Sequence, residues 1–214
     1  MRSIRIIVLL ITSFFFISTS YCKASDPDQT KLRWEEVYNK DDIQILDRSI
    51  PKTSSSVGFR ERKGILLAKC NADVAFKLIS DPKFTSKWMS GVDACKDFNR
   101  KGNTWENYTL FGLPWPFDNR ELYSKFTSSV SHEGYFKILI KSIDTLVVSK
   151  NQPLKDYYAE WTIKTLGNGY VEITMISASK TPPFVPLFIQ DPILLMVYKD
   201  NFKRLKSLLN SAGP

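Results

Sequence analysis

The chain has 214 residues, 43% of them hydrophobic, and a formal net charge of +8. This is enough sequence for one domain with a sizeable core. The basic residues are scattered without a Lys/Arg block, so the charge does not support nucleic-acid binding, although a mildly basic exported protein favours anionic membrane surfaces.

The amino terminus has the pattern of an export signal. Arg2 and Arg5 precede an apolar run over residues 6–17, which is too short to span a bilayer comfortably. Small residues follow, and cleavage after Ala24 or after Ser20 would fit this pattern.

From this pattern we expect a signal peptide at 1–24, a flexible lead-in at 25–31 and one domain at 32–212. The protein is then exported and is periplasmic or secreted. Two alternatives stay open, in which the chain is anchored to a membrane through the uncleaved amino-terminal segment or through a lipid on Cys22.

Three cysteines are present, and Cys70 and Cys95 remain if Cys22 leaves with the signal. An even number of cysteines in an oxidising compartment permits a disulfide. Two buried free thiols are the alternative.

The first half of the domain predicts a mixture of short strands and helices. Residues 31–37 suit a short helix, and strands are expected at 43–46 and 57–70. Apolar residues at helical spacing then predict a pair of helices at 71–80 and 83–89.

The second half predicts an antiparallel meander followed by one long helix. Strands are expected at 92–99, 104–111, 119–130, 135–141, 157–166 and 170–179. The Gly167-Asn168-Gly169 turn is a strong hairpin signal between the last two strands. Asp191 followed by Pro192 provides an N-cap and a first helical residue for an amphipathic helix of about twenty residues.

This order of elements predicts an α+β fold. A curved antiparallel sheet with a long helix across its mouth buries the apolar side of both.

Alternation along the third meander strand turns Leu122 and Phe126 toward the core, together with Arg120. A buried arginine requires a partner or water because desolvation of its charge is costly. Arg120 is therefore either part of a structural ion pair, with Asp118, Glu121 or another acid, or a polar anchor for a ligand head group in an apolar cavity.

A stiff apolar loop separates the second and third meander strands. Pro114 and Pro116 donate no N–H and keep this segment out of a central ladder. The loop carries large apolar side chains at Leu113, Trp115 and Phe117. Such a rigid apolar loop suggests a lid, or a lip that faces a ligand or a membrane.

The sequence lacks common signatures of catalysis and cofactor binding. His132 is the single histidine, no His/Cys cluster suits a metal, and neither a Gly-rich phosphate loop nor a G-x-S-x-G elbow occurs. We therefore expect no metal and no other cofactor.

Four segments carry a family resemblance. They are Trp34 with Asp42-Ile43-Gln44-Ile45, then Ile79-Ser80-Asp81-Pro82 with Lys87-Trp88-Met89 and Val92, then the loop LPWPFDNRE at 113–121, and Pro183-Phe184-Val185-Pro186-Leu187. In this order they resemble the START (StAR-related lipid transfer) domains of the helix-grip (SRPBCC) superfamily, in a bacterial exported form. Ser90 replaces a proline of the family pattern, and Asn119 is an insertion in it.

The resemblance implies a helix-grip fold, with an apolar tunnel for one lipid between the sheet and the C-terminal helix. The loop with Leu113, Trp115 and Phe117 then resembles a gate that parts from the helix for lipid entry, in transient contact with a membrane. Some members of the family pair a cavity arginine with an acid in the strand that begins near Val92, and here either Asp93 or no residue would supply that acid.

The same resemblance bears on the cysteines and on the ligand site. If its sheet order makes the strand ending at Cys70 a neighbour of the strand beginning near Val92, Cys70 and Cys95 approach bonding distance. The side chains expected to contact a ligand are Trp88, Met89, Tyr108, Arg120, Leu122, Phe126, Trp161, Ile173, Met175, Leu194 and Tyr198. Most of these positions also suit plain core residues.

The leading hypothesis is a monomer that binds a lipid or other hydrophobic small molecule without catalysis, with lipid transfer as an extension of binding. A helix-grip cyclase-like or hydrolase-like enzyme acting on a hydrophobic small molecule is the alternative. An exported interaction module with a filled core is a third hypothesis.

Overall fold

The computed structural model describes residues 33–52, 58–112, 118–131, 134–144, 151–180 and 186–213. Several predictions concern residues outside this part of the chain, namely the export signal at 1–24 with Cys22, the lead-in at 25–31, the loop side chains Leu113, Trp115 and Phe117, and His132.

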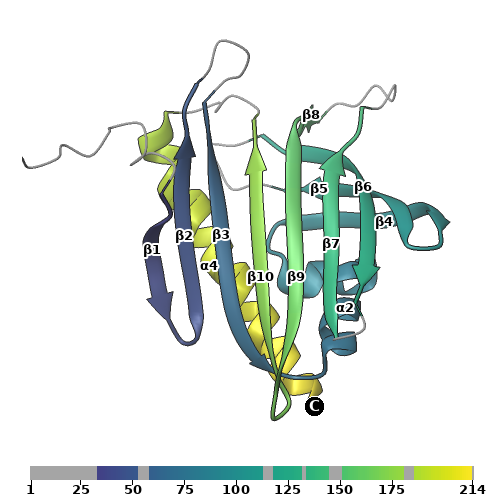
Figure 1. The fold of residues 1–214 in the computed structure, drawn as a ribbon. Helices are drawn as coiled ribbons and strands as arrows, with labels where there is room; N and C mark the ends of the chain where they lie inside the picture. The colour runs from purple at the N-terminus through teal and green to yellow at the C-terminus, as the bar shows by residue number, and fades with distance from the viewer. Residues whose placement is uncertain are drawn as a thin grey trace, which may run out of the picture.

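One curved sheet of ten strands forms the body of the domain (Figure 1). In chain order the strands are β1 Glu35–Lys40, β2 Ile43–Ile50, β3 Phe59–Lys69, β4 Val92–Lys101, β5 Thr104–Phe111, β6 Arg120–Val130, β7 Tyr135–Ser142, β8 Gln152–Pro153, β9 Tyr157–Gly167 and β10 Tyr170–Ser179. Nine strands follow the order β1-β2-β3-β10-β9-β7-β6-β5-β4 with antiparallel neighbours, whereas β8 pairs with β6 in parallel. The predicted meander is confirmed.

Helices pack on one side of this sheet. They are α2 Ala72–Ser80, α3 Pro82–Trp88 and α4 Leu187–Ala212. In Figure 1 the yellow α4 runs obliquely behind β3 and β10, and α2 lies toward β7 and β9. The predicted α+β arrangement of a curved antiparallel sheet with a long C-terminal helix is therefore confirmed.

The helix pair α2 and α3 forms where local capping signals occur. The Asn71 side chain accepts a hydrogen bond of 2.9 Å from the backbone N–H of Asp73 at the start of α2. Asp81 ends α2 and caps α3, accepting 3.0 Å from the Lys83 N–H, with Pro82 as the first helical residue. Both predicted helices are confirmed. The sequence predicts them because these capping signals act within a few residues.

The predicted helix at 31–37 is wrong in its described part. Residues 35–40 form β1, which pairs with β2 in an antiparallel hairpin. Asp41 and Asp42 both have positive φ, at 56° and 55°, which suits a tight two-residue hairpin turn. The turn returns the chain directly onto β2, so pairing overrides the local helical spacing.

The predicted start of the last helix at Asp191 is also wrong. The helix begins at Leu187, where the carbonyl of Pro186 accepts from the N–H groups of Ile189 and Gln190 at 2.9 and 3.1 Å. Pro192 lies inside the helix rather than at its first position. Its missing N–H removes one backbone hydrogen bond close to the amino terminus of the helix.

A chain of aromatic contacts joins α4 to the sheet and to α3. Phe202 of α4 is 2% exposed and stacks on Trp161 of β9 with ring centroids 6.1 Å apart. Trp161 in turn meets Trp88 of α3 edge to face at 5.7 Å. Phe202 lies so close to β3 that a Cβ added to Gly64 would sit 2.3 Å from its ring. The absent side chain of Gly64 is therefore what lets the helix approach the sheet.

The sheet order contradicts a disulfide between Cys70 and Cys95. Cys70 follows β3 and Cys95 lies in β4, and five strands separate β3 from β4 in the sheet. Both cysteines are free thiols, so the alternative prediction of unbonded cysteines is confirmed, with Cys70 buried and Cys95 half-buried.

The two thiols should react at very different rates with iodoacetamide. Burial raises the pKa of Cys70 from 9.0 to about 11, so its thiolate fraction at pH 8 falls roughly 100-fold. Peptide mass spectrometry after timed labelling at pH 8 should find Cys95 modified well before Cys70. Equal labelling of Cys95 and Cys70 in protein that is shown to be folded would contradict the buried placement of Cys70.

Candidate functional site

A small cavity lies between α3 and the concave side of the sheet. Its volume is about 60 Å³. It is lined by Ile79, Ser80, Pro82, Thr85, Trp88, Met89, Cys95, Asn107, Thr109, Phe111, Leu122, Ser124, Phe126, Ile140, Tyr157, Trp161 and Met175. No described α4 residue belongs to this lining, so the cavity is not the predicted tunnel directly beneath α4. Phe202, Leu205 and Leu209 fill that space.

Six of the predicted ligand-contacting residues meet at this cavity. They are Trp88, Met89, Leu122, Phe126, Trp161 and Met175. They come from α3 and its C-cap, β6, β9 and β10. Period-two alternation placed the strand residues on the inward face, and the register of β5, β6, β7, β9 and β10 brings those faces together.

Tyr108 and Leu194 are misassigned. In β5 the inward residues are Trp105, Asn107 and Thr109, so Tyr108 points to the other face and packs on Tyr123 with ring centroids 4.9 Å apart. Burial, and then the charge of Glu121, raise the pKa of Tyr108.

Leu194 is 38% exposed on α4. The side chains of α4 that pack on the core are Leu195, Tyr198, Phe202, Leu205, Leu208 and Leu209. Leu194 precedes this face by one helical step, which rotates it away from the sheet.

Ile173 and Tyr198 lie in the core but outside the cavity lining. Ile173 is fully buried in β10. Tyr198 stacks on Phe202 at 5.0 Å and donates its hydroxyl proton to the Met175 carbonyl at 3.5 Å. Burial raises the pKa of Tyr198, so its hydroxyl stays neutral.

Arg120 lies on the inward face of β6, as predicted, but its side chain does not line the cavity. Its register partner is Phe111, and Leu122 two residues on pairs with Thr109, so Arg120 and Leu122 share the inward face. The side chain of Arg120 is half-buried and is not part of the cavity lining. Its role as a ligand anchor stays a prediction.

Glu121, the neighbour of Arg120 on β6, is only 3% exposed. It lies in the part of β6 that pairs with β8, where the backbone N–H of Leu154 donates to the Glu121 carbonyl at 2.8 Å. The pairing of β8 with β6 could not be foreseen, because residues 142–156 carry no clear strand pattern.

A neutral polar strip crosses the apolar cavity wall, and the sequence analysis missed it. Cys95, Asn107, Thr109 and Ser124 come from three neighbouring strands, β4, β5 and β6. Thr109 donates its hydroxyl proton to Asn107 Oδ1 at 2.7 Å, and Cys95 Sγ lies 3.5 Å from Thr109 Oγ1. The signal available in the sequence was that Asn107 and Thr109, two residues apart, place polar side chains on one face of a strand that also carries several aromatic residues.

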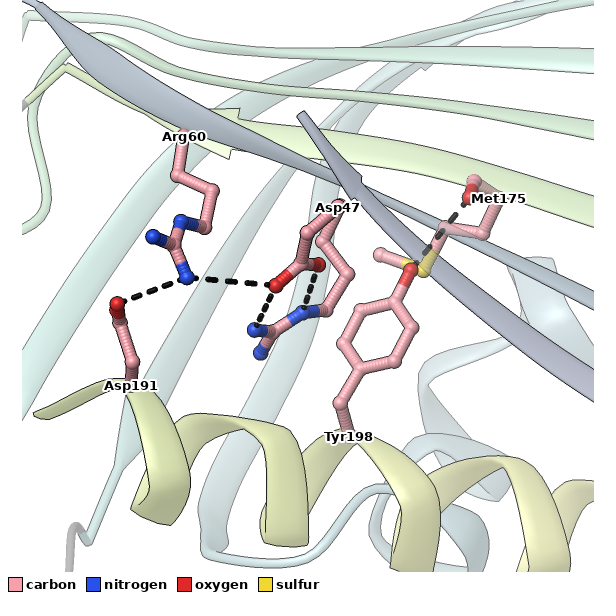
Figure 2. Close-up of polar contacts among 6 residues, drawn as sticks. Asp47, Arg60, Met175, Asp191 and Tyr198 are labelled. Atoms are coloured by element: carbon pink, nitrogen blue, oxygen red, sulfur yellow. Dashed lines mark hydrogen bonds and ion pairs between the residues drawn. The ribbon is translucent and has the colours of Figure 1, made fainter. Parts of the chain in front are cut away.

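A buried ion pair lies beneath α4, and the sequence analysis missed it as well. Arg62 donates to both oxygens of the Asp47 carboxylate at 2.7 Å, from Nε and from a terminal nitrogen. Arg60 lies 3.6 Å from the same carboxylate and 2.8 Å from Asp191 on α4 (Figure 2). Figure 2 also shows Tyr198 extending from α4 toward Met175 beside this cluster.

This cluster links the amino-terminal half of α4 to the sheet through charge. The signal for it was an aspartate at a core-facing position, because Ile43, Ile45 and Asp47 alternate inward along β2. A single sequence does not reveal that the partner is Arg62, which the β2–β3 register places directly opposite.

A second polar connection ties α4 to the turn after α3. The N–H of Ser90 donates to Asn201 Oδ1, and its hydroxyl donates to Asp200 Oδ2, both at 2.7 Å. The hydrogen bond from Ser90 lowers the pKa of Asp200, with a further contribution from Arg204 and opposition from partial burial. The ionised carboxylate is thus favoured in the folded state, and this contribution is lost as the pH falls through the lowered pKa.

Within the described residues, no helix is both long and apolar enough to cross a membrane. The same part of the chain holds no group of three or more His, Cys, Asp or Glu side chains placed to bind a metal ion.

Comparisons with known proteins were made at the level of sequence and of structure. No family profile matches the chain. A curated relative, the uncharacterized protein PA1579 of Pseudomonas aeruginosa, is 18% identical over 176 residues, which cover 81% of this chain and 85% of the relative.

Solved structures resemble the domain over most of its length. A STAR-related lipid transfer protein fragment from Xanthomonas axonopodis has a TM-score of 0.71 at 21% identity and covers 82% of this chain and 98% of the fragment. Human StAR-related lipid transfer protein 5 also has a TM-score of 0.71, at 7% identity, over 83% of this chain and 86% of its own.

An enzyme shares the architecture more distantly. The Zhui aromatase/cyclase from Streptomyces sp. R1128 has a TM-score of 0.53 at 7% identity and covers 71% of this chain and 93% of its own. Together with the sheet order, the cavity on the concave side and the packing of α4, these likenesses show that the chain has the helix-grip fold of START domains.

Proposed function

We propose that this protein binds a lipid or similar hydrophobic small molecule in the cavity on the concave side of its sheet. The observation that carries the proposal is the cavity itself, because its walls are largely apolar and aromatic and interrupted by a few neutral polar groups. Ligand sites commonly have this composition. Lipid transfer by relatives of the same fold, as their names state, supports the same proposal.

The cavity volume of about 60 Å³ is well below the roughly 300–1,000 Å³ typical of small-molecule sites. For the proposed function this volume corresponds to a closed state, and lipid binding would require that the cavity grow. Trp161 lines the cavity and also stacks on Phe202 of α4, so it separates the two. Outward movement of α4 with Phe202 would free the space that this ring fills and join it to the cavity.

Native mass spectrometry and a transfer assay test the proposal. Protein purified from the organism that encodes it should carry a hydrophobic molecule, or should take up fluorescent lipid from donor vesicles and release it to acceptor vesicles. Protein that is always empty and moves no lipid between vesicles would refute the proposal and favour the filled-core interaction module. A bound molecule that is recovered chemically altered would instead support the cyclase-like or hydrolase-like alternative.

A disulfide between α4 and the α3–β4 turn would test the required movement. Ser90→Cys combined with Asp200→Cys replaces the hydrogen bond of 2.7 Å between these side chains by a covalent link. The oxidised form should exchange lipid at least about tenfold more slowly than the same protein after reduction, which serves as its matched control. Digestion and mass spectrometry verify the bond, because Cys70 and Cys95 are also present.

A further inference from the structure

We propose that the cavity selects lipids whose polar group is an uncharged hydroxyl and that Ser124 is the hydrogen-bonding partner of this group. The inference rests on the proposed function, because it concerns which hydrophobic ligand the cavity takes. Three observations carry it: an unpartnered buried hydroxyl, the hydrogen bonds of its neighbours, and the charge of the lining.

Ser124 is fully buried, and its Oγ has no hydrogen-bond partner among the described residues. It lines the cavity from β6, on the inward face between Leu122 and Phe126. A buried hydroxyl that has lost water without gaining a partner is destabilising. A ligand atom that hydrogen-bonds with Ser124 would remove this penalty, so the position favours ligands with a polar atom there.

The neighbours of Ser124 have already used their donors. Thr109 donates its hydroxyl proton to Asn107 Oδ1 at 2.7 Å. The Asn107 amide donates to Asp97 Oδ1 at 2.7 Å and contacts Cys95 Sγ at 3.3 Å. Thr109 therefore offers only lone pairs to a ligand, whereas Ser124 offers a proton and lone pairs. A ligand hydroxyl suits this pair, because it can accept from Ser124 and donate to an oxygen of the strip.

The lining contains no charged side chain among the described residues. Burial raises the pKa of Tyr157, so this lining hydroxyl also stays neutral. Asp97 lies behind the strip, and its carboxylate bonds with Asn107 and Arg100. A carboxylate or phosphate in the cavity would lose water without gaining a countercharge, which is costly. The cavity therefore disfavours ionised head groups.

Three ligands with the same sixteen-carbon chain separate these cases. Hexadecanol carries a hydroxyl, palmitate carries a carboxylate at pH 8.5, and hexadecane carries no polar group. Radiolabelled ligand partitioning between the full protein and methyl-β-cyclodextrin gives relative affinities, corrected for each ligand's affinity for cyclodextrin. Hexadecanol should bind at least about tenfold more tightly than palmitate.

The Ser124→Ala variant assigns the hydroxyl contact. It should weaken hexadecanol binding about three- to tenfold and leave hexadecane binding unchanged or tighter. It should also fold at least as stably as the wild type, because it removes an unpaired buried hydroxyl. Ser128→Ala is the matched control, since Ser128 is buried on the same strand, bonds to the Asn103 carbonyl at 3.3 Å and lies outside the cavity lining.

The outcomes separate this inference from the proposed function. Equal affinity for hexadecanol and palmitate, or hexadecanol binding that is insensitive to Ser124→Ala, would overturn the hydroxyl assignment and leave lipid binding intact. Failure of the wild type to bind any of the three ligands would overturn the proposed function and the assignment together.

Discussion

Replacing Arg62 by methionine should lower the free energy of unfolding by about 3–5 kcal/mol, the usual loss when one partner of a buried ion pair is removed. Arg62 and Asp47 are 9% and 7% exposed and are joined by two hydrogen bonds of 2.7 Å. The variant leaves the Asp47 carboxylate buried, and among the described residues its remaining ion-pair partner is Arg60 at 3.6 Å. Urea denaturation followed by tryptophan fluorescence measures the loss.

Two further variants separate a buried charge from lost packing. Asp47→Leu combined with Arg62→Met should recover most of the stability, because no charge remains buried. Arg204→Met removes an exposed ion pair with Asp200 and should change stability by less than about 1 kcal/mol. A double variant as unstable as Arg62→Met alone would show that the side-chain volume of Arg62 matters rather than its charge.

Phe202→Ala should also destabilise the fold by about 3–5 kcal/mol, the range for truncating a buried aromatic side chain. Phe202 is 2% exposed, lies between Tyr198 and Trp161, and covers Gly64 of β3. Its removal leaves a gap between α4 and the sheet that rigid strands cannot close. Thermal and urea unfolding measure the loss.

Gly64→Ala provides the partner for a double-mutant cycle. In the wild type the added Cβ would sit 2.3 Å from the Phe202 ring, so the change should cost about 1–3 kcal/mol. In the Phe202→Ala background the obstacle is absent and alanine suits a strand better than glycine, so the same change should be neutral or stabilising. Equal costs in both backgrounds would contradict the direct contact.

The parts of the fold that the sequence predicts are those fixed by local signals or by strong alternation. Asn71 and Asp81 cap α2 and α3 within three residues of sequence. The meander strands alternate clearly enough that Leu122 and Trp161 reach the cavity as expected. These features require no knowledge of which segments meet.

The errors arise where partners are distant in sequence. Residues 31–37 suit a helix by their spacing, but residues 35–40 are drawn into the sheet by pairing with β2. β5 has apolar residues on both faces, so nothing local shows that Tyr108 faces outward. The predicted proximity of Cys70 and Cys95 depended on the assumption that their strands are neighbours, and in the sheet they are not.

The site shows the same division. Ser124 is a small polar residue in an inward position, and only the three-strand register shows that it lies beside Asn107 without a hydrogen-bond partner. Arg62 has an ordinary place in a strand until β2 brings Asp47 opposite to it. Which polar groups are buried depends on how the strands assemble, so it cannot be predicted from one strand alone.

The two halves of α4 differ in how firmly they are held, and this sets how the domain opens. The buried residues of α4, Phe202, Leu205 and Leu209, all lie in its carboxyl-terminal half. The amino-terminal half has exposed apolar side chains at Leu187, Phe188 and Met196. It reaches the sheet through the ion pair between Asp191 and Arg60 and through the partly buried Leu195 and Tyr198. We therefore expect sub-global opening to begin at Leu187. Salt should promote it, because salt screens ion pairs at partly exposed positions but leaves apolar packing intact. Fraying of this end alone leaves Phe202 packed on Trp161, so the wider opening that the proposed ligand needs must also release the carboxyl-terminal half of the helix from the sheet.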